Sequence, residues 1–143
     1  MTPVPERNLF TMEGTISVDH HPGERALVGG WHSLCTPHFR EALEKAMAEA
    51  GRLGVLTWIV DLTRNPGVPS QADLAWINDR GVFLAKRAGV RAIVNAHGSS
   101  TVAKMGAKRW SKSASDGGLS TYDCGSLEDA LKLAADIAAG KAA

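Results

Sequence analysis

The chain has 143 residues, of which 44% are hydrophobic and 22% charged, and its 16 lysines and arginines nearly balance 15 acidic residues, for a formal net charge of +1. This length is typical of a single domain that buries enough apolar surface for a core of its own. The balanced charge gives no overall reason to expect a nucleic-acid partner or an anionic membrane, and every apolar segment is far shorter than the roughly 20 residues of a membrane helix.

The two cysteines, Cys35 and Cys124, lie far apart and form no CxxC pair. The first residues, MTPVPERN, lack the basic start and apolar stretch of a signal peptide. We therefore expect a cytoplasmic protein in which both thiols are buried and reduced, in preference to a disulfide. The predicted domain spans residues 9–139, with short tails at 1–8 and 140–143.

The first predicted elements are two β-strands, GTISVDH and ERALVGGW, joined by HPGE, whose Pro-Gly pair is typical of a type II turn. This pattern predicts a β-hairpin. Thr36 and Pro37 are residue types favoured at the N-cap and the first position of a helix. Apolar residues follow at helical spacing from Phe39 to Ala50, and we expect that helix to end at Gly51.

The rest of the chain alternates strands and helices. VLTWIVDL is an almost continuous apolar run with β-branched residues, which predicts a central strand covered on both faces. A helix over 71–88, ended by Gly89, leads to the buried strand VRAIVNA, and a third helix is predicted over 101–112. The strand LSTYD and a last helix capped by Ser126 complete the series.

This element order favours an α/β fold with a mixed, mostly parallel sheet, an N-terminal antiparallel hairpin and about four helices. In that order the chain resembles the STAS-like (SpoIIAA-like) family, the fold of anti-sigma-factor antagonists and related small bacterial proteins. The resemblance covers residues 9–139 and rests on VGGWHSLCTPHFREAL, WIVDL, AGVRAIVNA and YDCGSLEDAL. It implies a bacterial regulatory module that contacts a protein partner. The fold is also related in shape to CRAL-TRIO lipid-transfer domains, which implies an apolar ligand as an alternative.

Ser70 stands at the predicted start of the second helix. In the antagonist branch of the family, a serine of a D-S-S-G motif at this place is phosphorylated by a partner kinase. The sequence here reads VPSQAD and lacks that motif, which puts the chain outside this branch. Ser70 lies three residues before Asp73, as in a weakened capping box, so the N-cap is favoured over regulatory phosphorylation. Asp73 would also oppose a phosphate at Ser70.

The predicted helix over 71–88 has two aromatic residues opposite its apolar face, with two arginines beside them. These four residues form the predicted partner-binding surface: Trp76, Arg80, Phe83 and Arg87. Exposed aromatics beside arginines are typical of interface hot spots, and in the STAS-like family this helix is the one that meets partners. We expect a protein partner or self-association. The alternative is that an N-terminal segment with Leu9 and Phe10 covers the aromatic pair.

The segment GSSTVAKMGAKRWSK places small polar residues before a helix that has lysines at steps of four. Free backbone N–H groups at a helix start can hold an anion. The candidate anion-binding residues are Gly98, Ser99, Ser100, Thr101 and Lys104. The alternative is a solvated lysine face with no ligand. An anion or a lipid is the small-molecule alternative to a protein partner.

His32, Cys35 and His38 form an H-x2-C-x2-H pattern near the Asp-His-His run at 19–21. Structural zinc sites usually have four converging ligands from paired knuckles, so we expect no metal and no cofactor. No GxSxG, P-loop, GxGxxG or HExxH motif is present. The leading prediction is a non-enzymatic protein without catalytic residues. The catalytic alternative uses Cys35 with either histidine, or Asp61 at the end of the central strand.

Overall fold

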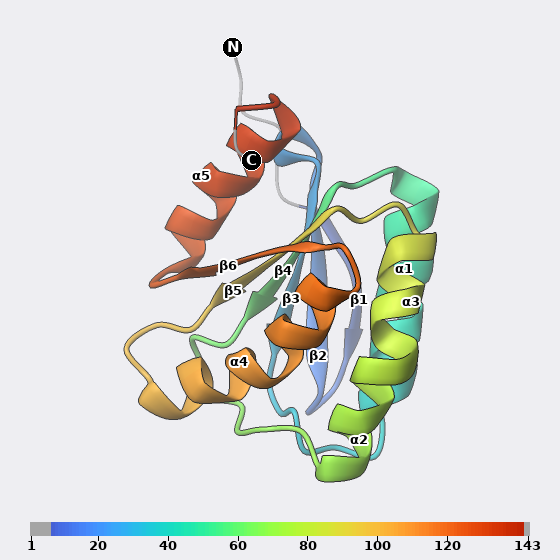
Figure 1. Cartoon of the computed structure of the whole chain (residues 1–143), viewed down its shortest axis with the longest axis vertical. Helices are drawn as coiled ribbons and strands as arrows, with labels where there is room; N and C mark the ends of the chain where they lie inside the picture. Colours follow the sequence, from blue (N-terminus) through green and yellow to red (C-terminus); the bar gives the residue numbers. More distant parts are fainter. Residues whose placement is uncertain (1–6, 142–143) are drawn as a thin grey trace.

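The computed structural model describes residues 7–141, which form one six-stranded mixed sheet with helices on both faces (Figure 1). The strands are β1 (Arg7–Met12), β2 (Ile16–His21), β3 (Ala26–Trp31), β4 (Thr57–Asp61), β5 (Ala92–Ala96) and β6 (Ser120–Cys124), and they lie side by side in chain order. The pairs β1–β2 and β2–β3 are antiparallel, and the strands from β3 to β6 are parallel. This arrangement confirms the predicted α/β class.

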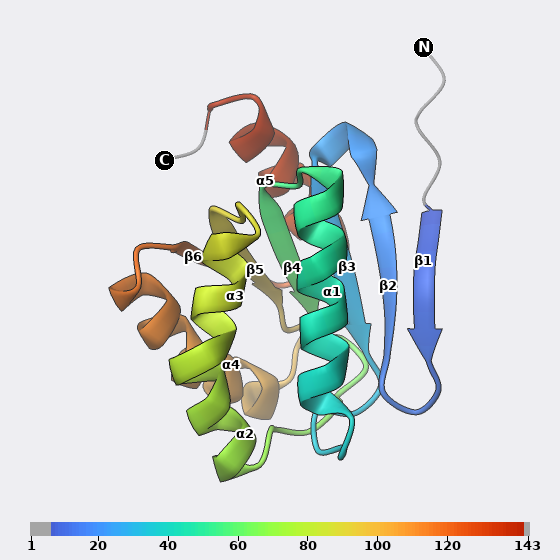
Figure 2. The ribbon, with the colours of Figure 1, turned by 90° about the vertical axis from the view of Figure 1, so that its right-hand side faces the viewer.

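The helical segments are η1 (Pro22–Glu24), α1 (Phe39–Leu53), α2 (Gln71–Trp76), η2 (Ile77–Gly81), α3 (Val82–Arg87), α4 (Thr101–Asp116) and α5 (Leu127–Ala138). The segments α2, η2 and α3 follow one another without a break and are called the second helix below. Each right-handed crossover passes over the same face of the sheet, so α1, the second helix and α4 form one layer. The last helix, α5, lies on the opposite face (Figures 1 and 2).

Two hydrophobic cores follow from these layers. Side chains alternate between the two faces of a strand, so Trp58 and Val60 of β4 belong to the main core under the three-helix layer. Ile59, between them, belongs to the smaller core under α5, with Val94 of β5. Since β4 pairs with β3 on one side and β5 on the other, it is the buried central strand that the sequence predicted.

The edge strand β1 was not predicted, and its first residues fall in the predicted tail. The tails at 1–8 and 140–143 otherwise lie mostly outside the described residues. Phe10 of β1 lies beneath Lys45 of α1, whose Nζ is 4.7 Å from the ring centre. Figure 2 shows α1 between β1 and α3. Because Phe83 of α3 is 47% exposed, the alternative that Leu9 and Phe10 cover the aromatic pair is wrong for Phe83.

Several predicted element ends also differ from the structure. The first helix continues past Gly51 and ends at Gly54, whose left-handed φ of 67° suits glycine. Gly51 instead lies where a Cβ would be 3.7 Å from Ala88, the residue that follows the second helix, an ordinary contact. Thr36 does not cap α1 directly, since α1 begins at Phe39 and the Thr36 hydroxyl accepts from the His38 N–H at 3.3 Å. The predicted Pro-Gly turn is the 3-10 turn η1.

Candidate functional site

The second helix begins with the cap that the sequence predicts. The N–H of Asp73 donates to Ser70 Oγ at 3.1 Å, and Ser70 has extended backbone angles, as an N-cap residue does. The carboxylate of Asp73 in turn accepts from Arg40 Nε of α1 at 2.8 Å. The cap interpretation of Ser70 is confirmed. Its phosphorylation stays a prediction.

The middle of the second helix is a π turn, in which the N–H of Val82 donates to the carbonyl of Ile77. A bond over five residues inserts one extra residue and turns the rest of the helix by about 100°. A periodic count that assumes an unbroken α-helix therefore misplaces the two ends relative to each other. Val82 is buried beside Gly81, Trp76 is half-buried against the main core, and Phe83 is exposed. We expected both aromatic side chains to face solvent. Phe83 does so, whereas Trp76 is only partly exposed.

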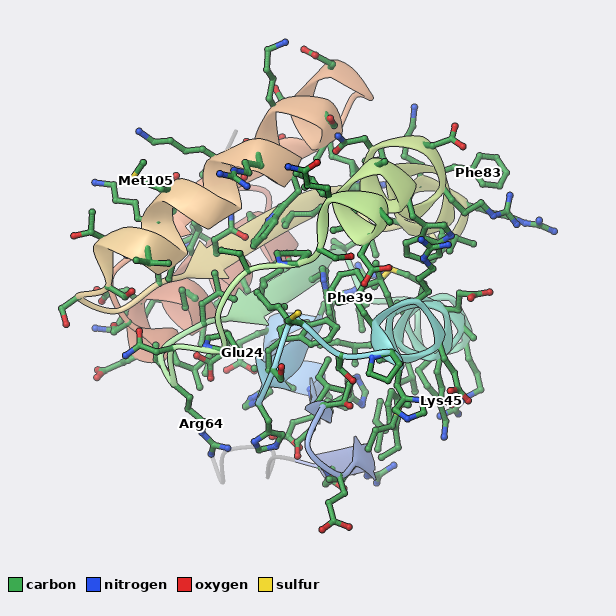
Figure 3. The ribbon with its side chains drawn as sticks, turned by 90° about the horizontal axis from the view of Figure 1, so that it is seen from below. Glu24, Phe39, Lys45, Arg64, Phe83 and Met105 are labelled. Atoms are coloured by element: carbon green, nitrogen blue, oxygen red, sulfur yellow. The ribbon has the colours of Figure 1, made fainter. Side chains whose placement is uncertain are left out.

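Phe83 points outward from α3, as Figure 3 shows. The guanidinium carbon of Arg80 lies 5.0 Å from the centre of its ring, a cation–π contact that holds both side chains on the outer face of the helix. Arg87, one helical turn further on, is also exposed. The guanidinium carbon of Arg40 of α1 lies 5.9 Å from the ring centre of Trp76. Three of the four predicted partner-binding residues are thus accessible, and Trp76 is partly so.

Charge is segregated between the two faces of the molecule, although the total is nearly balanced. From residue 71 to residue 116 the chain has eight lysines and arginines against three aspartates. Asp73 and Asp116 are already paired, with Arg40 and with Lys112. The helix α5 on the opposite face has three acidic residues and one lysine. The second helix and α4 are therefore together net basic, whereas α1 beside them is balanced, with three basic and three acidic residues. The overall composition did not indicate this difference.

Two further hydrophobic side chains are exposed on α4: Val102 at 63% and Met105 at 62%. They lie one turn apart, and Lys104 and Lys108 beside them are exposed as well. The sequence predicts a basic stripe on this helix, and the two apolar residues form no part of that prediction. Together with Phe83 they are the large hydrophobic residues exposed in the part of the chain that the structure describes.

The candidate anion site lies at the start of α4. Ser100 is the N-cap of α4, and its Oγ accepts from the Ala103 N–H at 3.1 Å, so part of the helix start is already satisfied. A hollow of about 360 Å³ separates this start from the β4–α2 loop. Of the five predicted residues, Ser99 and Ser100 line it, and Gly98, Thr101 and Lys104 do not. Anion binding stays a prediction.

The residues of the catalytic alternative do not form a reactive pair within residues 7–141. Cys35 is exposed, where the sequence predicted burial, because it lies in the loop before α1. No hydrogen bond of the described residues joins its thiol to His32 or His38. The ring Nδ1 of His32 accepts from Arg64 Nη1 at 3.3 Å, and His38 Nδ1 lies 3.6 Å from Glu41. Figure 3 shows Arg64 reaching outward from its loop.

Asp61 acts as a local cap. Its carboxylate accepts from the N–H of Thr63 at 3.0 Å and from the Thr63 hydroxyl at 2.7 Å, so it orders the loop that follows β4. The other cysteine, Cys124, is half-buried and free. Burial, and then Asp129 and Asp123, raise the pKa of the Cys124 thiol, which disfavours the reactive thiolate.

Metal ligands do not converge within residues 7–141: no group of three or more histidine, cysteine or acidic side chains is placed to hold an ion. Helices long and apolar enough to cross a bilayer are likewise absent from the described residues. The fold and surface thus define an α/β protein with a net basic pair of helical segments, the second helix and α4, on one face of its sheet and an exposed aromatic ring, Phe83, among them. Searches against protein-family models, curated proteins and solved structures found no match. The STAS-like resemblance therefore stays a prediction.

Proposed function

We propose that the protein is a non-enzymatic protein-binding module of STAS-like fold, which contacts its partner through the outer face of the second helix and the loop before it. The observation that carries this proposal is Phe83, an aromatic ring that is 47% exposed with the Arg80 guanidinium stacked on it. Aromatic and arginine side chains supply most hot-spot energy at protein interfaces. A partner pocket that takes the ring would remove it from water and keep the arginine contact.

The charge around Phe83 supports a partner with acidic residues. Arg80, Lys86 and Arg87 are exposed on the same helix, and α4 beside it adds further lysines. Complementary charge speeds association and orients the two proteins, and salt weakens this effect. The partner surface that fits is an apolar pocket with carboxylates at its rim.

The resemblance to the STAS-like family supports the same surface, since that family meets its partners with the helix at this place. We also propose a bacterial origin, on that resemblance, and a cytoplasmic location, because the two cysteines are free. Ser70 is the proposed regulatory position, because it is exposed at the start of the contact helix and beside the Asp73–Arg40 ion pair. A phosphate there would compete with Asp73 for Arg40.

The test is affinity capture from a lysate of the native cell with three versions of the chain as bait. They are the wild type, Phe83→Ser, and Met105→Ser as a control that removes an even more exposed apolar residue, from α4. We expect one partner that the wild type and Met105→Ser retain and Phe83→Ser loses. A partner that Phe83→Ser retains, or that both variants lose equally, contradicts the proposal. Sedimentation of the same three proteins tests self-association through Phe83.

A further inference from the structure

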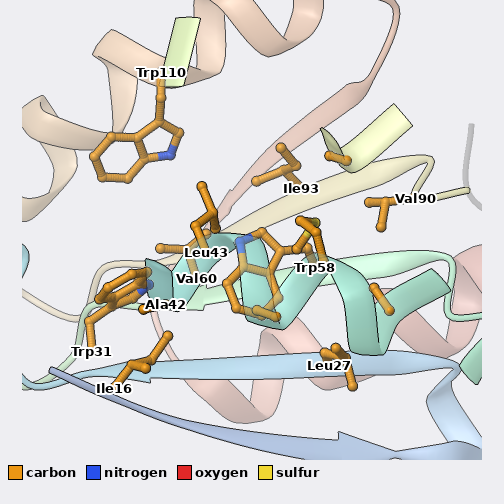
Figure 4. Packing of buried hydrophobic residues seen from close by; sticks show 14 of the residues in the cluster. Ile16, Leu27, Trp31, Ala42, Leu43, Trp58, Val60, Val90, Ile93 and Trp110 are labelled. Atoms are coloured by element: carbon orange, nitrogen blue, oxygen red, sulfur yellow. The ribbon is translucent and has the colours of Figure 1, made fainter. Parts of the chain in front are cut away.

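The main core contains an apolar cavity of about 60 Å³ between the sheet and the three-helix layer. Three tryptophans contribute to its wall: Trp31 from β3, Trp58 from β4 and Trp110 from α4 (Figure 4). Protein interiors are packed as densely as organic crystals, and voids larger than a water molecule are few in any domain. An apolar space of this size against the largest core therefore needs an explanation.

The lining of the cavity is almost wholly apolar. The indole N–H of Trp110 is already used, because it donates to Asn95 Oδ1 at 2.9 Å. Water is stable in a cavity only where several polar partners surround it, whereas apolar cavities stay dry and accept apolar guests. The chemistry of the wall thus favours a molecule without hydrogen-bonding groups.

Gly81 is a glycine in the wall of the cavity. It is buried in the second helix, with ordinary helical angles of φ −62° and ψ −45°. An added Cβ would be 3.5 Å from Leu43 Cδ2 and 3.6 Å from Ile77, which are normal contacts. Neither backbone conformation nor crowding requires glycine here, and alanine is the better helix former. The missing methyl group leaves volume in the cavity, whose wall includes Gly81.

The wall beside Gly81 is also the least regular part of the helical layer. Ile77 and Gly81, the two ends of the π turn, both line the cavity. Single π turns are rare and occur frequently at functional sites, since an extra residue in a helix is retained at some cost in regularity. An apolar space in the packing, a glycine that the backbone does not require and a π turn therefore coincide at one place.

We infer that this cavity is a binding site for a small, uncharged apolar molecule, held among the three indoles and the π turn. The guest is smaller than benzene, because an apolar cavity that admits benzene measures about 150 Å³. This site lies beneath the second helix, whereas the proposed protein-binding surface is its outer face. The inference is independent of that proposed function, because a protein partner is not needed for the cavity to fill.

The test uses xenon as the probe and methyl NMR spectra of the full chain under increasing xenon pressure. Three proteins are compared: the wild type, Gly81→Ala, and Gly51→Ala. Gly51 is the matched control, because it is a helical glycine with room for a Cβ but lies outside the cavity wall. We expect saturable shifts at the methyl groups of Leu43, Ile77 and Val82 in the wild type and Gly51→Ala. Gly81→Ala should lower the xenon affinity at least severalfold.

Ala114→Val narrows the same cavity from α4 and serves as the second filling variant. The spectrum of each variant before xenon is added shows that it is folded. Saturable xenon shifts that either folded filling variant lowers support the inference. A wild type without saturable shifts at the lining methyl groups overturns it. Full wild-type affinity in both folded filling variants also overturns it.

Discussion

The indole of Trp58 lies directly over Gly29 of the neighbouring strand, so that a Cβ at Gly29 would be 2.3 Å from Trp58 Cη2. Real Cβ contacts do not reach this distance, and the other close atoms belong to buried side chains. Trp58 can therefore occupy its position in the main core only because residue 29 has no Cβ. This close approach makes Gly29 a sensitive point for stability.

Gly29→Ala should destabilise the protein by about 1–3 kcal/mol, the usual cost of overpacking a core. The matched control is Gly30→Ala, next along β3, where a Cβ would be 3.6 Å from the Ser17 carbonyl. We expect the control to change the free energy of unfolding by less than about 0.5 kcal/mol. Urea unfolding followed by tryptophan fluorescence measures both. Equal effects of the two substitutions would show that Trp58 does not need Gly29.

Gly81→Ala should stabilise the protein. Replacing a helical glycine by alanine gains about 0.5–1 kcal/mol, and a methyl group buried in the cavity adds up to about 0.8 kcal/mol. Gly51→Ala should gain mainly the helical part, because its added methyl group would touch Ala88 and lies outside the cavity. Thermal unfolding of both variants measures the difference. A Gly81→Ala protein less stable than the wild type would mean that the π turn requires glycine.

The α/β fold was predictable because its signals are local. The apolar run around Trp58 predicts a strand buried on both faces, and Ser70 and Ser126 carry the side-chain oxygens that cap the helices after them. The edge strand β1 escaped prediction, because one of its faces is not buried and its residues do not alternate clearly. Gly51 resembles a helix end in sequence, but only the structure shows that α1 continues to Leu53, with Gly54 as its C-cap.

The candidate site was less predictable, since it depends on geometry that no local pattern encodes. A π turn replaces one backbone hydrogen bond by another and has no residue signature. The angle between the Trp76 and Phe83 side chains around the helix axis therefore could not be predicted from their spacing in the sequence. The charge segregation depends on which face of the sheet each crossover covers. The cavity depends on how three tryptophans from distant parts of the chain pack, which is a property of the folded core.

Ser70→Ala should destabilise the protein by about 1 kcal/mol, because the N–H of Asp73 loses its acceptor. Ser70→Asn is the control, since asparagine caps helices as well as serine does. Chemical denaturation of the two variants measures the change. If Ser70→Ala were as stable as the wild type, the hydrogen bond to Ser70 would contribute nothing, and the residue's place in the sequence would need another explanation.

Substitutions at Trp76 and at Phe83 should differ in their effect on the free energy of unfolding. Phe83→Ser removes an exposed ring, so the free energy of unfolding should change by less than about 0.5 kcal/mol. Trp76→Ser removes a ring packed against the main core and should cost at least about 1 kcal/mol. Differential scanning calorimetry of both variants tests this contrast. A large loss of stability in Phe83→Ser would place the ring in the core and remove the basis of the proposed function.

Stability should also depend on pH through His20. Burial, followed by the positive charges of Arg7, His21 and Arg52, lowers the pKa of His20 below its ordinary value of 6.5. Its ring Nδ1 is buried and accepts no hydrogen bond from the described residues. The folded protein therefore binds a proton at His20 less readily than the unfolded chain does. The contribution of His20 to stability is then fully present above pH 6.5 and is lost as the pH falls below that value.

The measurement is the free energy of unfolding between about pH 5 and pH 8, the range in which histidines titrate, for the wild type and for His20→Asn. We expect the wild type to lose stability toward the acidic end more steeply than the variant. His38→Asn is the matched control, because it removes a histidine that is exposed on the surface and leaves the buried ring nitrogen of His20 in place. A His20→Asn protein with the wild-type slope would assign the pH dependence to other groups, and His20 would then titrate as an ordinary surface histidine.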